Sequence, residues 1–158
     1  MFGLFLYGML PYALQAQSTA NVPAFQLATF EGASFTEKNL PNNQMVFFCF
    51  FDITCDHCRH AITSINKEHS KFGKTALYLV SLDNKQGVYN FLNKYGPILL
   101  TKKNVTLLHD AQNEFIYKFK PKKYPAMYLY SVQKSLVLYA DDEKSIPLFL
   151  KKIQPAAK

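Results

Sequence analysis

Two cysteines separated by two residues are the part of this 158-residue chain whose chemistry is most specific. Cys55 and Cys58 follow an apolar run at residues 45–51, and the residues after them carry apolar side chains at helical spacing. The pair therefore falls where a buried strand ends and a helix begins. Unpaired backbone N–H groups and the helix dipole favour negative charge at that point, and a thiolate benefits from both. Because the thiolate is the reactive form of cysteine, this arrangement predicts thiol–disulfide exchange.

The third cysteine differs from the other two. Cys49 lies inside the apolar run among phenylalanines, which predicts a buried and unreactive thiol.

The elements that position the cysteines follow from apolar periodicity. A Gly32 turn joins two short extended segments, and strands and helices then alternate before a closing hairpin and a last helix. This order predicts an α/β fold: a central mixed β-sheet flanked by helices on both faces, with a short N-terminal β extension. The expected strands are residues 45–51, 75–82, 104–109, 126–130 and 135–139, and the expected helices are 58–69, 85–95, 113–119 and 142–153.

The composition is that of a globular domain, with 49% hydrophobic and 18% charged residues. The formal net charge is +7, but no nucleic-acid motif accompanies the lysines, so a solvated surface is the preferred interpretation and no nucleic-acid partner is expected. An anionic partner or a membrane surface stays open as an alternative. The densest basic group consists of Lys118, Lys120, Lys122 and Lys123.

Residues 1–20 carry no charged side chain and change from apolar to small and polar after Leu14. This pattern is typical of a signal peptide, with an uncleaved N-terminal anchor as the alternative. We therefore expect one domain over residues 21–158 in an exported protein, periplasmic or otherwise extracytoplasmic, with membrane association through the N-terminal segment left open. A pair of cysteines can persist as a disulfide in such a compartment.

With Cys55 and Cys58 at a strand-to-helix turn and Tyr124-Pro125 opening a late hairpin strand, the chain resembles the thioredoxin superfamily. The resemblance implies a thioredoxin-like fold and a cis bond before Pro125, facing the cysteines. Tyr124 and Pro125 would then line a substrate groove. We expect Cys55, at the exposed end of the turn, to attack and Cys58 to resolve the mixed disulfide.

The segment before the first central strand narrows this resemblance. Residues 23–27 and the Gly32 turn resemble the exported TlpA/ResA-like thiol–disulfide oxidoreductases, and the likeness covers roughly residues 22–153. Three positions depart from the superfamily: Thr54 stands where a Trp is usual, Cys49 replaces a buried Asp, and Ala61 replaces a Glu of the ResA-like proteins. The proton of Cys58 would therefore pass to water, His57 or another group.

Charges next to the cysteines tune the pair in opposite directions. A histidine at the position of His57 resembles the oxidising members of the superfamily, where it favours the thiolate and makes the disulfide a stronger oxidant by about 30 mV per 1.4 kcal/mol. Asp52 and Asp56 disfavour a thiolate by a similar amount. Either direction of electron flow stays open at this point.

Other functions of the motif are also considered. Zinc would need a second ligand pair, and copper would need a distant histidine, for which His109 is the only candidate. We expect no metal and no organic cofactor, with protein dithiols and disulfides as substrates and electron donor. The alternatives are a copper or metal chaperone and a redox-inactive interaction module. A peroxide reductase on the same fold is disfavoured because the segment before Cys55 lacks the Pro and Thr that those enzymes use.

Overall fold

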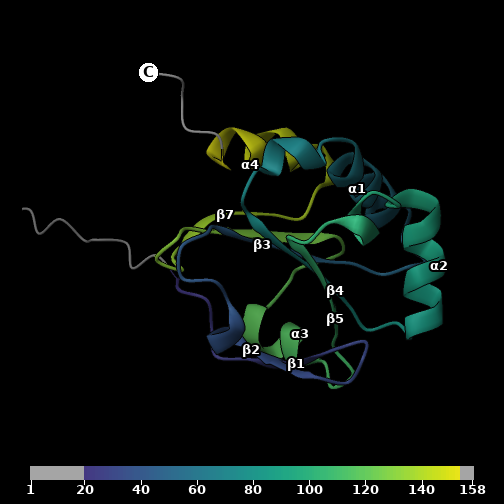
Figure 1. Cartoon of the computed structure of the whole chain (residues 1–158), viewed down its shortest axis with the longest axis horizontal. Helices are drawn as coiled ribbons and strands as arrows, with labels where there is room; N and C mark the ends of the chain where they lie inside the picture. Colours follow the sequence, from purple (N-terminus) through teal and green to yellow (C-terminus); the bar gives the residue numbers. More distant parts are fainter. Residues whose placement is uncertain (1–19, 154–158) are drawn as a thin grey trace, which may run out of the picture.

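A computed structural model, which describes residues 20–153, shows one seven-stranded mixed sheet with helices on both faces (Figure 1). The strand order is β2-β1-β5-β4-β3-β6-β7, in which β3, β4 and β5 are parallel and the other pairings are antiparallel. This is the expected fold class. The strands are β1 (Gln26–Thr29), β2 (Ser34–Thr36), β3 (Val46–Phe50), β4 (Ala76–Ser81), β5 (Val105–His109), β6 (Ala126–Tyr130) and β7 (Leu136–Ala140). The α-helices are α1 (Asp56–Lys67), α2 (Lys85–Tyr95), α3 (Glu114–Phe119) and α4 (Ile146–Ile153), and the 3₁₀ turns are η1 (Glu37–Asn39), η2 (His69–Phe72), η3 (Leu99–Thr101) and η4 (Glu143–Ser145).

The two central strands β3 and β4 are buried along their whole length, as their continuous apolar sequences predict. Alternate side chains of β3 enter different layers of the core. Phe47 and Cys49 pack with the apolar faces of α1, α2 and α4. Phe48 and Phe50 pack on the opposite face with the two phenylalanines of α3, in a cluster of aromatic rings. The cysteine pair thus belongs to the layer covered by three helices.

The starts of the first and the last helix differ most from those expected. Helix α1 begins at Asp56, ahead of Cys58, because the backbone N–H of Cys58 is already bonded to the side chain of Cys55 as the N-cap residue. The last helix is divided into η4 and α4, since the Asp142 side chain caps the separate turn η4 through the backbone N–H of Lys144 at 2.9 Å. The first difference concerns the turn that carries Cys55 and Cys58, and the second places Glu143 in η4.

The chain enters the fold beside the β6–β7 hairpin. The carbonyl of Ala20 accepts the backbone N–H of Leu136 at 2.9 Å, and Asn21 bridges to Ser135. The expected signal peptide or anchor at residues 1–20 lies outside the described residues, apart from Ala20.

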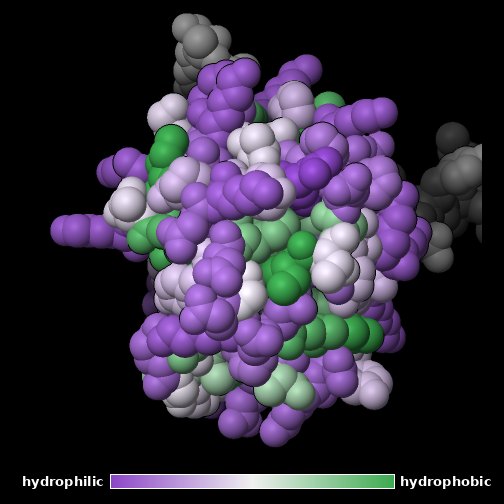
Figure 2. All heavy atoms as spheres, turned by 90° about the vertical axis from the view of Figure 1, so that its right-hand side faces the viewer, coloured by the Kyte–Doolittle hydropathy of each residue, from purple (hydrophilic) through white to green (hydrophobic). Residues whose placement is uncertain are grey.

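The surface on the side that carries α2 is mostly hydrophilic, with hydrophobic side chains confined to small groups (Figure 2). None of the helices within residues 20–153 is long and apolar enough to cross a membrane.

Candidate active site

The sulfur of Cys55 lies at the N-terminus of α1. Cys55 is the N-cap residue in extended conformation, and its Sγ accepts the backbone N–H of Cys58 at 3.3 Å. Its carbonyl accepts the backbone N–H of Arg59 at 3.1 Å, which starts the helical hydrogen bonds. The side chain of Cys55 remains partly exposed. A partly exposed sulfur that accepts a helix N–H is a position where a thiolate is stabilised and reachable.

The turn before Cys55 is held by two aspartates. One Asp52 oxygen accepts both the backbone N–H and the hydroxyl of Thr54, each at 2.6 Å, and the Asp52 carbonyl accepts the N–H of Cys55 at 3.3 Å. Asp83, which follows β4, accepts the N–H of Ile53 at 3.1 Å. Thr54 is therefore held in this turn by Asp52, directly before Cys55.

The other two thiols are sealed from solvent. Cys58 and Cys49 are both 0% exposed and belong to the same core layer, one on α1 and one on β3. Burial raises the pKa of the Cys58 thiol far above its ordinary value, and a backbone hydrogen bond from Asp52 opposes part of this rise. Burial also raises the pKa of Cys49 to about 12. The structure thus confirms that Cys49 is a buried thiol, and it places one accessible sulfur in front of two buried ones.

The Tyr124–Pro125 bond is cis, as the resemblance implied. The Tyr124 ring packs against Phe50 with centroids 4.9 Å apart and joins the core layer to which Cys55 also packs. Burial raises the pKa of Tyr124, and negative charge on Asp52 and other nearby acids adds to this. A hollow of about 110 Å³ lies beside Tyr124 and is lined by Phe50, Ile116, Pro121, Lys122, Lys123 and Tyr124.

The histidine between the cysteines has a partner that lies 86 residues away along the chain. The Nδ1 atom of His57 is 3.1 Å from both carboxylate oxygens of Glu143 in η4. The side chain of His57 is 68% exposed and that of Glu143 only 17%. The hydrogen bond with His57 lowers the pKa of Glu143, so this carboxyl is ionised at neutral pH. On the same helix, Asp56 pairs with Arg59 at 3.2 Å, which offsets the charge that Asp56 brings toward the thiols.

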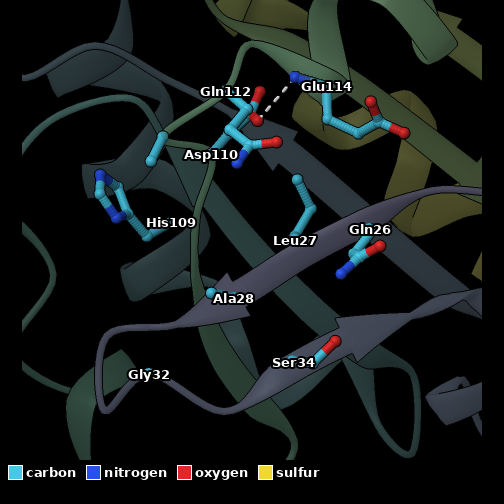
Figure 3. A pocket seen from close by; sticks show the side chains of 10 residues that line it. Gln26, Leu27, Ala28, Gly32, Ser34, His109, Asp110, Gln112 and Glu114 are labelled. Carbon is cyan, nitrogen blue, oxygen red and sulfur yellow. Dashed lines mark hydrogen bonds between the residues drawn. The ribbon is translucent and has the colours of Figure 1, made fainter.

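A hollow of about 360 Å³ lies away from the cysteines. It lies between the β1–β2 hairpin and the loop after β5, where the backbone N–H of Glu114 donates to Asp110 (Figure 3). His109 and Glu114 lie on opposite sides of Asp110 and their side chains point apart (Figure 3). The ring of His109 stacks on Phe30 at 5.3 Å. Within the described part of the chain, no three His, Cys, Asp or Glu side chains are grouped closely enough to hold a metal ion.

The structure places His57 and Tyr124 around one hollow and sets His109 in a separate one. It also adds two residues near the cysteines that the sequence analysis missed. Glu143 and Asp83 gave no motif of their own. A signal for Asp83 existed, because it directly follows the parallel strand next to the one that leads to Cys55, and such strand ends meet at one edge of a sheet. No comparable signal points to Glu143.

Three features together define a thioredoxin-fold protein. They are the parallel β3–α1–β4 unit, the antiparallel β6–β7 hairpin preceded by a cis-proline, and the CxxC pair at a helix N-terminus. A family model described as the AhpC/TSA family matches residues 19–139, which include both cysteines and Pro125. The chain therefore belongs to the AhpC/TSA family. This membership is consistent with the TlpA/ResA-like resemblance stated from the sequence. No curated protein matches the sequence significantly.

Solved structures similar to this chain include three with different named roles. A secreted disulfide oxidoreductase of Mycobacterium tuberculosis, homologous to E. coli DsbE, has 16% identity and a TM-score of 0.65, over 81% of this chain and 95% of that one. Arabidopsis thaliana ScoI with copper bound has 19% identity and a TM-score of 0.62, over 85% and 98%. Peroxidoxin BcpB of Mycobacterium tuberculosis has 12% identity and a TM-score of 0.70, over 89% and 98%. At these identities the likeness establishes the shared fold.

Proposed function

We propose that the protein exchanges disulfides with other proteins outside the cytoplasm, through Cys55 and Cys58. The observation that carries the proposal is the pairing of a partly exposed Cys55 sulfur, which accepts a helix N–H, with a buried Cys58 directly behind it. This division of exposure suits one thiol for attack on a partner and the other for an internal second step.

In the reducing direction, the Cys55 thiolate attacks one sulfur of a partner disulfide and expels the other as a thiolate, which takes up a proton. Cys58 then loses its proton and attacks the Cys55 sulfur of the mixed disulfide. The products are the Cys55–Cys58 disulfide and a reduced partner, so two electrons have moved to the partner. Oxidation of a partner dithiol is the reverse sequence.

Substrate binding is assigned to the surface beside the pair. Tyr124 and Pro125 would form the wall against which a partner segment lies, with the 110 Å³ hollow beside Tyr124 open to one of its side chains. Protein dithiols and disulfides act as substrates and electron donor. The extracytoplasmic location rests on the character of residues 1–20 and on similarity to a secreted oxidoreductase.

The experiment compares Cys55→Ser and Cys58→Ser with Cys49→Ala as the matched control for loss of a thiol. We expect Cys55→Ser to abolish reduction of a model protein disulfide such as insulin. Cys58→Ser should accumulate mixed disulfides through Cys55, visible on non-reducing gels. Cys49→Ala should keep exchange activity, although a smaller side chain in the core lowers stability. If Cys55→Ser reduced the protein disulfide at the rate of the wild type, the proposal would be refuted.

A copper chaperone is the second candidate, because ScoI with copper bound shares the fold. It would use the two thiolates of the CxxC pair, which are soft ligands suited to Cu(I). Stoichiometric Cu(I) binding that needs both cysteines, without turnover of protein disulfides, would favour this candidate. A redox-inactive interaction module would show neither property.

A further inference from the structure

The pairing of His57 with Glu143 has a chemical consequence that follows from the atoms involved. A carboxylate can only accept hydrogen bonds, and both Glu143 oxygens lie 3.1 Å from Nδ1 of His57. Nδ1 must therefore carry the hydrogen, whether the ring is neutral or charged. In the neutral ring the free lone pair is then on Nε2, which is the nitrogen available to receive a proton.

Glu143 is placed for this contact by the fold. It belongs to the 3₁₀ turn η4, which the Asp142 side chain caps at one end and the buried Ile146 follows at the other. The Glu143 side chain is largely buried, whereas the His57 ring is 68% exposed and can meet both water and a partner. A fixed carboxylate behind an accessible imidazole is the arrangement in which the acid orients the ring and stabilises its charged form.

The other charges around the ring balance one another. A hollow of about 190 Å³ beside His57 is lined by Lys123, Tyr124, Asp141, Asp142, Glu143 and Lys144. Lys123 lies 3.8 Å from Asp141, and Asp56 on the helix pairs with Arg59. Glu143 is the acid bonded to the ring, so it has the largest influence on the charge of His57.

We infer that Glu143 and His57 form a carboxylate–imidazole dyad that handles the proton of thiol–disulfide exchange at Cys55, with Glu143 as a positioning residue. The inference rests on the proposed function and names the group that accepts the proton of Cys55. Before Cys55 attacks, its proton passes to Nε2 of His57, directly or through water, which leaves the attacking thiolate. The resulting imidazolium, held by Glu143, returns the proton to the leaving thiolate, so no net charge is created.

The first test reads the ring itself. In ¹⁵N NMR spectra of the wild-type protein with a neutral His57 ring, we expect the Nδ1–H tautomer of His57. Glu143→Ala should shift the ring toward the Nε2–H tautomer that free histidine prefers. A wild-type ring in the Nε2–H form would overturn the dyad.

The second test reads the chemistry with bis(2-hydroxyethyl) disulfide, an uncharged probe that needs no protein-binding surface. We expect Glu143→Gln to lower the rate of reaction with Cys55 at pH 7 by about two- to fivefold, the effect of one exposed charge pair. The loss is expected although a negative charge is removed, because Glu143 is hydrogen-bonded to the ring at 3.1 Å and acts on the ring most directly. Asp142→Asn removes one charge from the same hollow without touching the ring and should change the rate less.

The double variant His57→Gln/Glu143→Gln separates the dyad from a general charge effect. Within the dyad, Glu143→Gln has no further effect once His57 is replaced. Equal effects of Glu143→Gln in both backgrounds would overturn the inference. If the wild type reacts with the small disulfide and shows this coupling but never turns over protein disulfides, the dyad stands and the proposed function fails.

Discussion

Asp110 and Glu143 each line a hollow of this protein, and both side chains have little exposed surface. Their hydrogen-bond partners differ. Asp110 is 2% exposed, and its oxygens accept the backbone N–H groups of Glu114 and Phe115 at 2.7 and 2.9 Å. Burial raises the pKa of Asp110 in spite of these bonds. Glu143 instead reaches another element, and the His57 ring lowers the pKa of Glu143.

The difference shows that the size of a hollow does not identify the site. The Asp110 hollow is about 360 Å³ and the one beside His57 about 190 Å³, yet only the smaller adjoins the turn that carries the cysteines. Both carboxylate oxygens of Asp110 accept hydrogen bonds from backbone N–H groups at the start of α3, so Asp110 stabilises the fold. Glu143 leaves a titratable ring between itself and the solvent, and that ring can take part in chemistry.

The largest expected effect in this comparison is on stability. Asp110→Ala leaves the N–H groups of Glu114 and Phe115 at the start of α3 without partners, and the second of these bonds is buried. We expect the free energy of unfolding to fall by about 2–3 kcal/mol. Glu143→Ala, which breaks a contact to an exposed ring, should cost less than about 1 kcal/mol. Equilibrium unfolding in urea measures both. If Glu143→Ala were the more destabilising change, the structural role assigned to Asp110 and the chemical role assigned to Glu143 would be contradicted.

The two acids should also give opposite pH dependences. The pKa of Asp110 is raised by burial, so its contribution to stability is full below its ordinary value of 3.8 and is lost as the pH rises through the folded-state pKa. The pKa of Glu143 is lowered by His57, so its contribution is present above its ordinary value of 4.5 and is lost as the pH falls through the folded-state pKa.

Unfolding free energies of the wild type, Asp110→Asn and Glu143→Gln between about pH 3 and pH 6 test these signs. The difference in unfolding free energy between the wild type and Asp110→Asn should decrease as the pH rises. The difference between the wild type and Glu143→Gln should increase. Slopes of the same sign for both pairs would contradict the assignment.

The smallest effect concerns the other ion pair of the smaller hollow. Lys123 and Asp141 are 3.8 Å apart, and the lysine side chain is 64% exposed. We expect Lys123→Ala to change the free energy of unfolding by less than about 0.5 kcal/mol and the exchange rate with the small disulfide by less than twofold. A larger loss of rate would mean that Lys123, and not Glu143 alone, governs His57. Lys151→Ala on α4 serves as the matched lysine control.

The sequence predicted the elements that depend on local pattern. Helix α2 has the expected bounds at Lys85 and Tyr95, and the central strands β3 and β4 lie within the expected ranges, since apolar periodicity there is strong. The cis bond at Pro125 followed from a resemblance and was confirmed. The start of α1 was placed too late, because a cysteine as N-cap residue is not a common capping signal.

The parts of the site that escaped prediction depend on distant contacts. The sequence analysis placed Glu143 in a helix starting at residue 142, whereas the structure places it in the separate turn η4, where it contacts His57. That contact joins residues far apart in the sequence and depends on how η4 packs against α1. No pattern in a single sequence encodes such a meeting of two surfaces.

The three cysteines differ in solvent exposure, and this difference allows unfolding to be followed by thiol labelling. Cys55 is partly exposed, whereas Cys58 and Cys49 have no exposed surface at all. A water-soluble alkylating reagent applied briefly to the reduced, folded chain therefore adds a single mass increment, and the second and third increments appear only in molecules that have opened. Because Cys49 lies on β3, which is paired on both sides within the sheet, its labelling marks loss of the whole fold, without any engineered probe.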